Sequence, residues 1–200
     1  MLQGQNPQSI GKAPFPNALD MFSIGIYAIF ITMPHRRKEP FLLEVLDEQD
    51  NIAVDLEKIR CICERILGDH KITSGKVNVV LVNSETILQY NRDFLQHNYP
   101  TDTISFPIED RRNEGYLEGE VLVCTEIAQC RAAEFGWTAE EELLLYIVHG
   151  LLHIVGFDDT TPEQRTIMQE KERSYLTMFG IQVPDWNWDD WDLADNRPFL

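Results

Sequence analysis

One stretch of this 200-residue chain decides its fold: residues 138–159, TAEEELLLYIVHGLLHIVGFDD. Thr138 and Glu141 have the spacing of a capping box, in which each side chain binds the backbone amide of the other residue. Residues 143–148 are apolar on every side of a helix, and such a helix must be buried. The sequence therefore predicts a central helix that runs through the core and ends at Gly156.

The segments before and after this helix alternate between strand and helix patterns. Apolar runs predict strands at residues 41–46, 77–82, 103–106 and 121–124. Helical spacing and end signals predict helices at residues 55–67, 84–95, 125–136 and 161–180, with Asp55 and Ser84 as caps and Gly68 as a stop. Pro107 is expected to close the third strand, and the charged residues 109–119 are expected to form an exposed loop. The predicted fold class is α/β (α+β), a single mixed sheet of about four strands with about five helices.

Composition divides the chain into three parts. Residues 41–182 are predicted to form one domain, which is an ordinary size for a single core. Residues 1–40 are predicted to be a largely disordered extension, with a short apolar segment at 22–32 that is too short to span a bilayer. Residues 183–200 carry three tryptophans among five aspartates. We interpret them as an acidic tail, either flexible or able to bind a partner.

Charge and cysteine usage narrow the class of protein. With 33 acidic and 17 basic residues, the formal net charge is −16. This charge argues against binding to nucleic acid through overall attraction, because neutralising phosphate requires cations, so any contact with RNA needs a local basic patch or a metal ion. The four cysteines form no CxxC pair, which indicates reduced thiols in a cytoplasmic protein.

The central helix carries the candidate metal ligands. His149 and His153 are four residues apart and therefore lie on one face of the helix. Gly156 permits a sharp turn, after which Asp159, or alternatively Asp158, can supply a third ligand. Two histidines and one carboxylate leave a coordination position open to water, as in catalytic metal sites. Two histidines that merely pack in a core or face solvent are the ordinary alternative, but the apolar flanks, the glycine and the acidic pair favour a metal.

The histidine spacing matches that of the zincin motif His-Glu-x-x-His, so the site is zincin-like. In that motif the glutamate is the general base of a metallopeptidase. This chain has Gly150 at that position. A peptidase of that type would lack its base, which disfavours peptide hydrolysis.

Three motifs carry a family resemblance. The segment HGLLHIVGFDD at 149–159 resembles the signature of the YbeY family, metal-dependent endoribonucleases of ribosomal RNA maturation. The segments NRDF at 91–94 with TDTISFP at 101–107, and GEVLVC at 119–124 with Glu126, are similar to two further family segments, and the likeness covers about residues 41–182.

This resemblance implies a zinc-dependent, single-strand-specific endoribonuclease, with His149, His153 and Asp159 as catalytic metal ligands. It implies a role in maturing the 3′ end of small-subunit rRNA and in ribosome quality control. The implied partners are rRNA and a ribosomal subunit or its proteins, with no DNA and no membrane, in the cytoplasm. The alternatives are a metal-dependent peptidase or other hydrolase, and a non-catalytic ribosome-associated module whose metal has a fourth ligand such as Cys124 or His97.

The chain departs from the family pattern at two positions. Asp159 stands where the family usually has a third histidine, and the carboxylate lowers the charge of the site by one. A metal held in this way acidifies water less, and iron or manganese are accommodated as well as zinc. Leu95 stands where many members have an arginine that is a proposed phosphate contact.

The resemblance also suggests residues that contact RNA. By analogy, Thr101 and Ser105 are candidates for hydrogen bonds to phosphate or ribose, although a serine satisfied within its strand is the ordinary alternative. The basic candidates are Arg92, Arg111, Arg112 and Arg131. Glu120 and Glu126 are candidates for a general base or for a partner of a ligand histidine.

Overall fold

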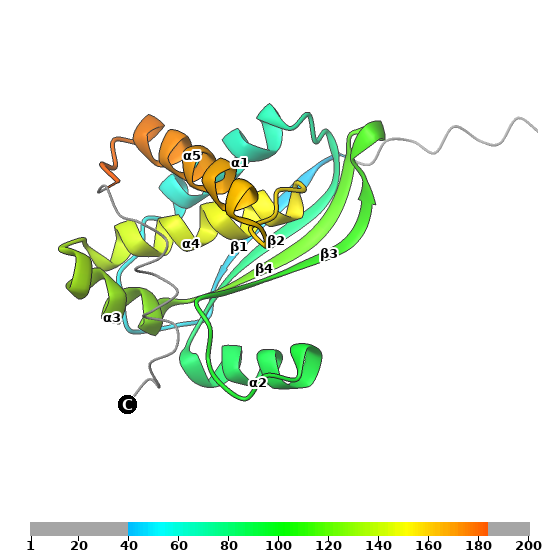
Figure 1. Ribbon diagram of the computed structural model, residues 1–200. Helices are drawn as coiled ribbons and strands as arrows, with labels where there is room; N and C mark the ends of the chain where they lie inside the picture. The colour runs from blue at the N-terminus through cyan, green and yellow to red at the C-terminus, as the bar shows by residue number, and fades with distance from the viewer. Residues whose placement is uncertain (1–39, 184–200) are drawn as a thin grey trace, which may run out of the picture. The chain divides into compact units, whose positions relative to one another are not determined.

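The computed structural model describes residues 40–183 (Figure 1). The predictions for the N-terminal extension and for the acidic tail therefore lie outside the described residues, apart from the end positions 40 and 183. Among the helices that are described, none has the length and apolar character needed to cross a membrane.

The strands form a single four-stranded sheet with the order β1-β2-β4-β3. The strands are β1 (Leu42–Asp47), β2 (Ser74–Val82), β3 (Thr103–Arg111) and β4 (Tyr116–Cys124). β1, β2 and β4 run parallel, whereas β3 pairs antiparallel with β4 at the edge of the sheet. The predicted mixed sheet of about four strands is confirmed.

Helices cover both faces of the sheet (Figure 1). The helices are α1 (Leu56–Asp69), α2 (Ser84–Leu95), α3 (Thr125–Phe135), α4 (Ala139–Ile154) and α5 (Pro162–Met178), with a short 3₁₀ turn at Arg112–Glu114. α1, α4 and α5 lie on one side, and α2 lies on the other (Figure 1). α4 packs against β3, β4, α1, α3 and α5, and this position explains why its sequence is apolar all round.

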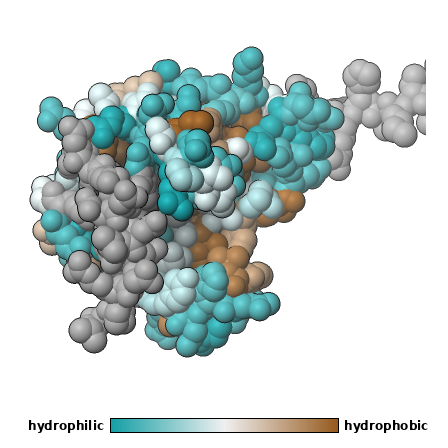
Figure 2. All heavy atoms as spheres, in the orientation of Figure 1, coloured by the Kyte–Doolittle hydropathy of each residue, from teal (hydrophilic) through white to brown (hydrophobic). Residues whose placement is uncertain are grey.

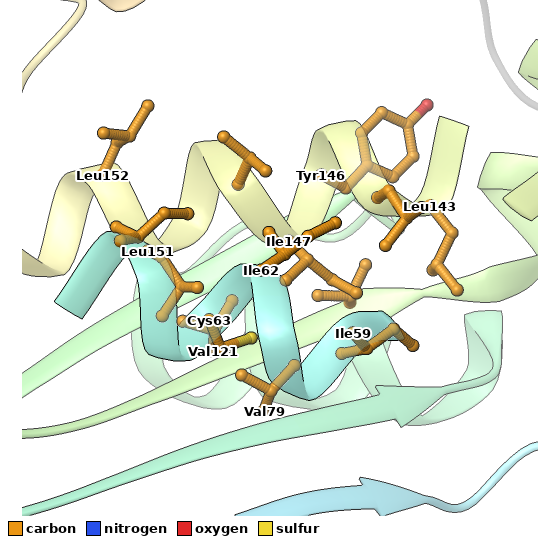
Figure 3. Packing of buried hydrophobic residues seen from close by; sticks show 14 of the residues in the cluster. Ile59, Ile62, Cys63, Val79, Val121, Leu143, Tyr146, Ile147, Leu151 and Leu152 are labelled. Carbon is orange, nitrogen blue, oxygen red and sulfur yellow. The ribbon is translucent and has the colours of Figure 1, made fainter. Parts of the chain in front are cut away.

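The predicted capping box at the start of α4 is present. The Thr138 hydroxyl accepts from the Glu141 amide at 3.2 Å, and the Thr138 amide donates to the Glu141 carboxylate at 2.9 Å. Further along α4, Leu143, Ile147 and Leu151 are fully buried and face α1 and the sheet (Figure 3). This packing holds α4 rigidly in place, and the histidines follow in the same helix.

The predicted end of α1 and the predicted N-cap of α2 were wrong. α1 continues past Gly68 to Asp69, and the chain turns only at Lys71, where φ is 59°. A glycine inside a helix costs only about 1 kcal/mol, so the packing of the rest of the helix outweighs it. The cap of α2 is Asn83 rather than Ser84, because the Asn83 side chain accepts from the Thr86 amide at 2.9 Å.

The predicted exposed loop at residues 109–119 was also wrong. β3 continues through Pro107 to Arg111, and β4 begins at Tyr116, so this segment is mostly a β-hairpin. Proline lacks the amide needed for a sheet interior, but an edge strand with a bulge tolerates it. β3 is such a strand, and its register shifts between Pro107 and Glu109. The conformation of this segment is set by pairing between β3 and β4, and the charges of its residues do not reveal that pairing.

A buried acid in α4 makes the stability of the fold depend on pH. Burial raises the pKa of Glu142 from 4.5 to about 7, although the neighbouring Tyr146 opposes the rise. The folded state thus holds this proton more tightly than the unfolded state, and the free energy of unfolding falls as the pH rises from about 4.5 through 7. We expect Glu142→Gln to remove this fall and to stabilise the protein by up to about 3 kcal/mol at a pH of about 8.

Urea denaturation over a pH series measures this effect. Glu64→Gln, at an exposed position of α1, is the control and keeps the wild-type dependence on pH. A loss of stability in Glu142→Gln at every pH would show that the carboxylate is held by contacts that an amide cannot replace.

Candidate metal centre

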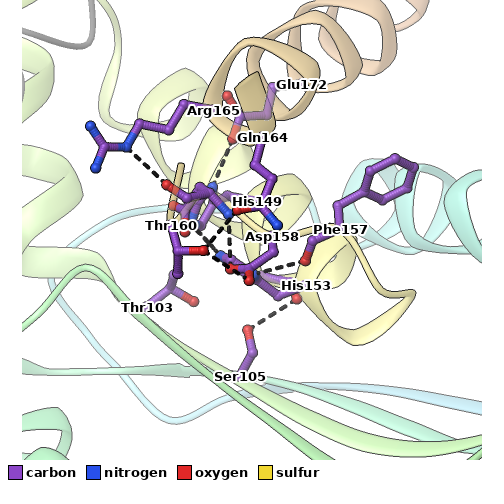
Figure 4. Close-up of polar contacts among 12 residues, drawn as sticks. Thr103, Ser105, His149, His153, Phe157, Asp158, Thr160, Gln164, Arg165 and Glu172 are labelled. Carbon is purple, nitrogen blue, oxygen red and sulfur yellow. Dashed lines mark hydrogen bonds and ion pairs between the residues drawn. The ribbon is translucent and has the colours of Figure 1, made fainter. Parts of the chain in front are cut away.

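The two histidines of α4 meet at their Nε2 atoms (Figure 4). His149 and His153 lie one helical turn apart, and their Nε2 atoms are 3.0 Å from each other. The rings are nearly perpendicular, with an angle of 86° between their planes. The predicted placement of both imidazoles toward one point is therefore present.

The other ring nitrogens are fixed by hydrogen-bond acceptors. His149 Nδ1 lies 2.7 Å from a carboxylate oxygen of Glu172 on α5, and His153 Nδ1 lies 3.2 Å from the Phe157 carbonyl oxygen (Figure 4). The Phe157 carbonyl oxygen and the ionised Glu172 carboxylate can only accept hydrogen bonds. Each Nδ1 therefore carries the hydrogen. In the neutral rings the lone pairs then lie on the Nε2 atoms, as in histidines that bind metals.

Asp159 completes a group of three donor atoms. Its Oδ2 lies 3.7 Å from His149 Nε2 and 3.8 Å from His153 Nε2. Asp158 instead binds within its own turn, where its carboxylate accepts from the Asp159 amide and the Thr160 hydroxyl. Asp159, the first choice from the sequence, is therefore the carboxylate that faces the histidines.

The turn that delivers Asp159 depends on Gly156. This residue has a φ of +99°, a conformation that favours glycine. A Cβ there would overlap the Arg112 guanidinium, which would have to move aside, so the requirement for glycine comes from the backbone conformation. After the turn, Arg165 of α5 donates to the Asp159 carbonyl oxygen at 2.8 Å and ties the loop to that helix.

The electrostatics of the cluster favour a positive charge. Burial lowers the pKa of His149, but the Glu172 carboxylate more than compensates and raises the pKa to about 9. Burial and the charge on His149 lower the pKa of His153, and Asp159 partly opposes this. Two Nε2 lone pairs and a carboxylate oxygen that face one another repel unless a proton or a cation lies among them. The donor set thus fits a metal ion such as zinc, iron or manganese.

Sequence reasoning missed Glu172. Its side chain is almost completely buried, although glutamate is rarely buried without a partner. A signal for it exists in the sequence: Glu172 occupies the same helical stripe as Met168, Tyr175 and Leu176, which are all buried. A single carboxylate within an apolar stripe indicates a buried partner, and here the partner is His149.

Gly150, between the two histidines, faces the sheet. A Cβ at this position would lie 2.5 Å from Val121 Cγ1 and 3.1 Å from the Ser105 hydroxyl oxygen. A glutamate therefore has no room here, because α4 packs too closely on β3 and β4. Packing at position 150 therefore excludes the glutamate that a zincin peptidase needs there.

A cavity of about 410 Å³ opens beside the histidines. Its lining consists of Leu95, Asp102, Thr103, Ile104, Ser105, Pro107, His149 and His153. Of the predicted RNA contacts, Ser105 lies here, and its hydroxyl donates to the Gly150 carbonyl oxygen at 3.0 Å. Thr101 is not among the lining residues, and its hydroxyl donates to the Asp102 carboxylate at 3.0 Å just before β3 begins.

The predicted basic contacts are paired with carboxylates or amides. Arg111 binds Glu109 and Glu114, and Arg112 binds Asp110, in the hairpin formed by β3 and β4. Arg92 donates to the Asn98 side chain, and Arg131 is mostly buried beside Glu134. Roles of these arginines in binding RNA stay predictions.

The remaining candidates lie in other hydrogen bonds. Glu120 accepts from the Asn78 side chain, and Glu126 accepts from the Ser84 amide at the start of α2. Cys124 contacts the Ser84 hydroxyl, and the His97 ring stacks on Tyr99. Within residues 40–183, the metal-ligand cluster contains His149, His153 and Asp159 but neither Cys124 nor His97 as a fourth ligand.

Comparison with known proteins identifies the family of the chain. The family model described as "Endoribonuclease YbeY" matches residues 44–180. The chain belongs to the YbeY family. This match lies within the domain predicted at residues 41–182, whose boundaries stay a prediction.

Individual YbeY proteins are similar over much of the chain. The Endoribonuclease YbeY of Rhodopirellula baltica is 46% identical over 112 residues, which cover 55% of this chain and 57% of that protein. The Endoribonuclease YbeY of Salinibacter ruber is 33% identical over 151 residues, which cover 72% of this chain and 94% of that protein. A solution structure of TM1509 from Thermotoga maritima matches with a TM-score of 0.51 and 29% identity, covering 76% of this chain and 93% of that one.

Proposed function

We propose that this protein is a zinc-dependent endoribonuclease that cleaves single-stranded ribosomal RNA and matures the 3′ end of small-subunit rRNA, with a further part in ribosome quality control. The observation that carries the proposal is the convergence of His149, His153 and Asp159, beside a cavity that the two histidines line, in a chain of the YbeY family. The two histidines and the aspartate are the proposed metal ligands.

The proposed metal is one zinc ion per chain, and iron or manganese also suit a site with two histidines and one carboxylate. When bound, such an ion polarises a phosphoryl oxygen and lowers the pKa of water. Around it, Glu172 orients the His149 ring, and the Phe157 carbonyl orients the His153 ring. Since Nδ1 of each ring is held, each Nε2 keeps its lone pair directed at one point.

Other residues of the chain shape the approach of the substrate. Ser105 lines the cavity with its hydroxyl oxygen near α4, where the oxygen can still accept a hydrogen bond from a ribose hydroxyl. Thr101 stands just before the same strand and is a weaker candidate for such a contact.

We further propose ribosomal partners and a cytoplasmic location. A chain with a net charge of −16 binds polyanions weakly, so a ribosomal subunit or ribosomal protein that presents the RNA would compensate. The four cysteines are free, as expected in a reducing compartment. Neither DNA nor a membrane is a proposed partner.

A cleavage assay on the full chain tests this function. We expect the zinc-loaded protein to cut an unpaired transcript of the small-subunit rRNA 3′ end, to lose this activity in EDTA, and to regain it with added Zn²⁺. A base-paired RNA and an unfolded polypeptide serve as competing substrates. Cleavage of the polypeptide with no cleavage of RNA would overturn the proposal in favour of a peptidase.

The carboxylate ligand gives a separate prediction. Asp159→His is expected to keep or raise zinc affinity, whereas Asp159→Ala is expected to lower it by more than about 100-fold, because one of three donor atoms is lost. Competition with a fluorescent zinc chelator measures both. Asp158→Asn is the control, since Asp158 binds within its turn. Zinc binding that survives Asp159→Ala but not Asp158→Asn would reassign the ligand.

A further inference from the structure

The cavity beside the histidines offers little to a phosphate backbone away from the metal. Apart from His149 and His153, its ionisable lining group is the Asp102 carboxylate, and none of the described lining residues is a lysine or an arginine. RNA that reaches the metal centre must therefore be held partly by contacts other than those between cationic side chains of the cavity lining and phosphate.

An aromatic patch lies next to this cavity, where α2 meets β3. We define it as Tyr90, Phe94 and Phe106, with Leu95 next to Phe94 in the chain. Phe94 is 64% exposed, which is unusual for a side chain of this size. Figure 2 shows apolar surface gathered between α2 and the sheet.

The rings of this patch support one another. Tyr90 and Phe94 are stacked, with centroids 5.7 Å apart and planes 24° apart. Phe106 meets Phe94 edge to face at 5.5 Å. Phe94 is thus held by rings from α2 and from β3 while most of its surface stays open to solvent.

The aromatic patch adjoins the cavity at the end of α2 and across the edge strand β3. Leu95 follows Phe94 in α2 and lines the cavity together with the histidines. Ser105 faces α4, whereas the ring of the next residue, Phe106, meets α2 on the other side of this edge strand. A strand of RNA with a phosphate at the metal centre therefore has neighbouring nucleotides within reach of these rings.

We infer that the aromatic patch binds unpaired bases of the RNA substrate by stacking, with Phe94 as the main contact. Stacking on an aromatic ring needs neither a cation nor a particular base, and it contributes about 1–3 kcal/mol per base. Bases inside a duplex have both faces covered, so the patch selects single strands. The inference rests on the proposed function, and it names the feature that gives the enzyme its preference for unpaired RNA.

The test measures binding of a single-stranded RNA of roughly ten nucleotides that carries 2-aminopurine, a base whose fluorescence falls on stacking. We expect the full-length, zinc-loaded protein to quench this fluorescence. Phe94→Ala should weaken binding about 5- to 150-fold, the equivalent of 1–3 kcal/mol. Phe94→Trp should restore binding, whereas Phe94→Leu, which stays apolar but has no ring, should bind as weakly as Phe94→Ala.

Two controls separate stacking from general damage. Ile167→Ala removes an exposed apolar side chain of similar size from α5 and should leave RNA binding unchanged. An RNA with an abasic position in place of 2-aminopurine should bind wild type and Phe94→Ala equally. Zinc content and thermal unfolding of each variant show whether the metal centre and the fold are intact.

Several outcomes would overturn the inference. If Phe94→Leu binds RNA as tightly as wild type, or if Phe94→Ala loses affinity equally for the abasic RNA, the patch does not stack on bases. If the wild-type protein cleaves RNA without quenching 2-aminopurine, base stacking on the patch is wrong and the proposed nuclease function still stands. Quenching without any cleavage supports the stacking and removes the proposed nuclease function instead.

Discussion

Replacing His153 with alanine is expected to abolish metal binding and RNA cleavage together while the fold survives. The ring provides one of the three converging donor atoms, and its loss leaves only His149 and Asp159. Loss of a residue that merely orients a ligand costs about 10- to 100-fold in affinity or activity, so loss of the ligand itself should exceed about 100-fold. The side chain is 26% exposed at the cavity, so its removal opens no closed hole in the core.

Metal analysis of the purified variant, cleavage of unpaired rRNA and a thermal unfolding curve measure the three parts of this result. His97→Ala is the matched control, because His97 is exposed and lies outside the cluster of donor atoms. The control should keep its metal. Full nuclease activity in His153→Ala would contradict the assignment of the metal centre.

The second large effect is expected at Glu172. Glu172→Gln keeps an oxygen that accepts from His149 Nδ1 but removes the negative charge beside the ring. We expect zinc affinity to fall about 10- to 100-fold with little change in stability. Glu172→Ala removes the acceptor altogether, and the buried Nδ1–H then costs about 1–3 kcal/mol in the free energy of unfolding.

Zinc competition and urea denaturation distinguish the two Glu172 variants. Glu170→Gln, on the exposed side of the same helix, controls for the loss of one negative charge and should bind zinc as wild type does. If all three variants bound zinc equally, Glu172 would be a buried acid with no part in orienting His149.

The local parts of the fold were predictable because their causes lie within a few residues. The capping box of α4 needs only Thr138 and Glu141, and the placement of two histidines on one face follows from helical geometry. The turn after α4 needs Gly156, and it brings Asp159 back over the same face. The mixed sheet followed from alternating strand and helix patterns.

The hairpin between β3 and β4 could not be predicted in the same way. Its charged residues indicate exposure but say nothing about whether the backbone pairs with another strand. Pro107 looked like a strand end, yet it lies in an edge strand at a bulge, where its missing amide costs little. The partner of Arg112 was equally hidden, since its guanidinium packs over Gly156 of a distant turn.

The sequence by itself determined the helix, the pair of histidines and the carboxylate that follows them, because a helical repeat and a glycine turn fix positions over short distances. The tertiary structure alone decided three further features. It placed Glu172 against His149, it left no room for a side chain at Gly150, and it joined Phe94 to Phe106 beside the cavity. Each of these joins residues of different elements, and which elements meet depends on how the whole core packs.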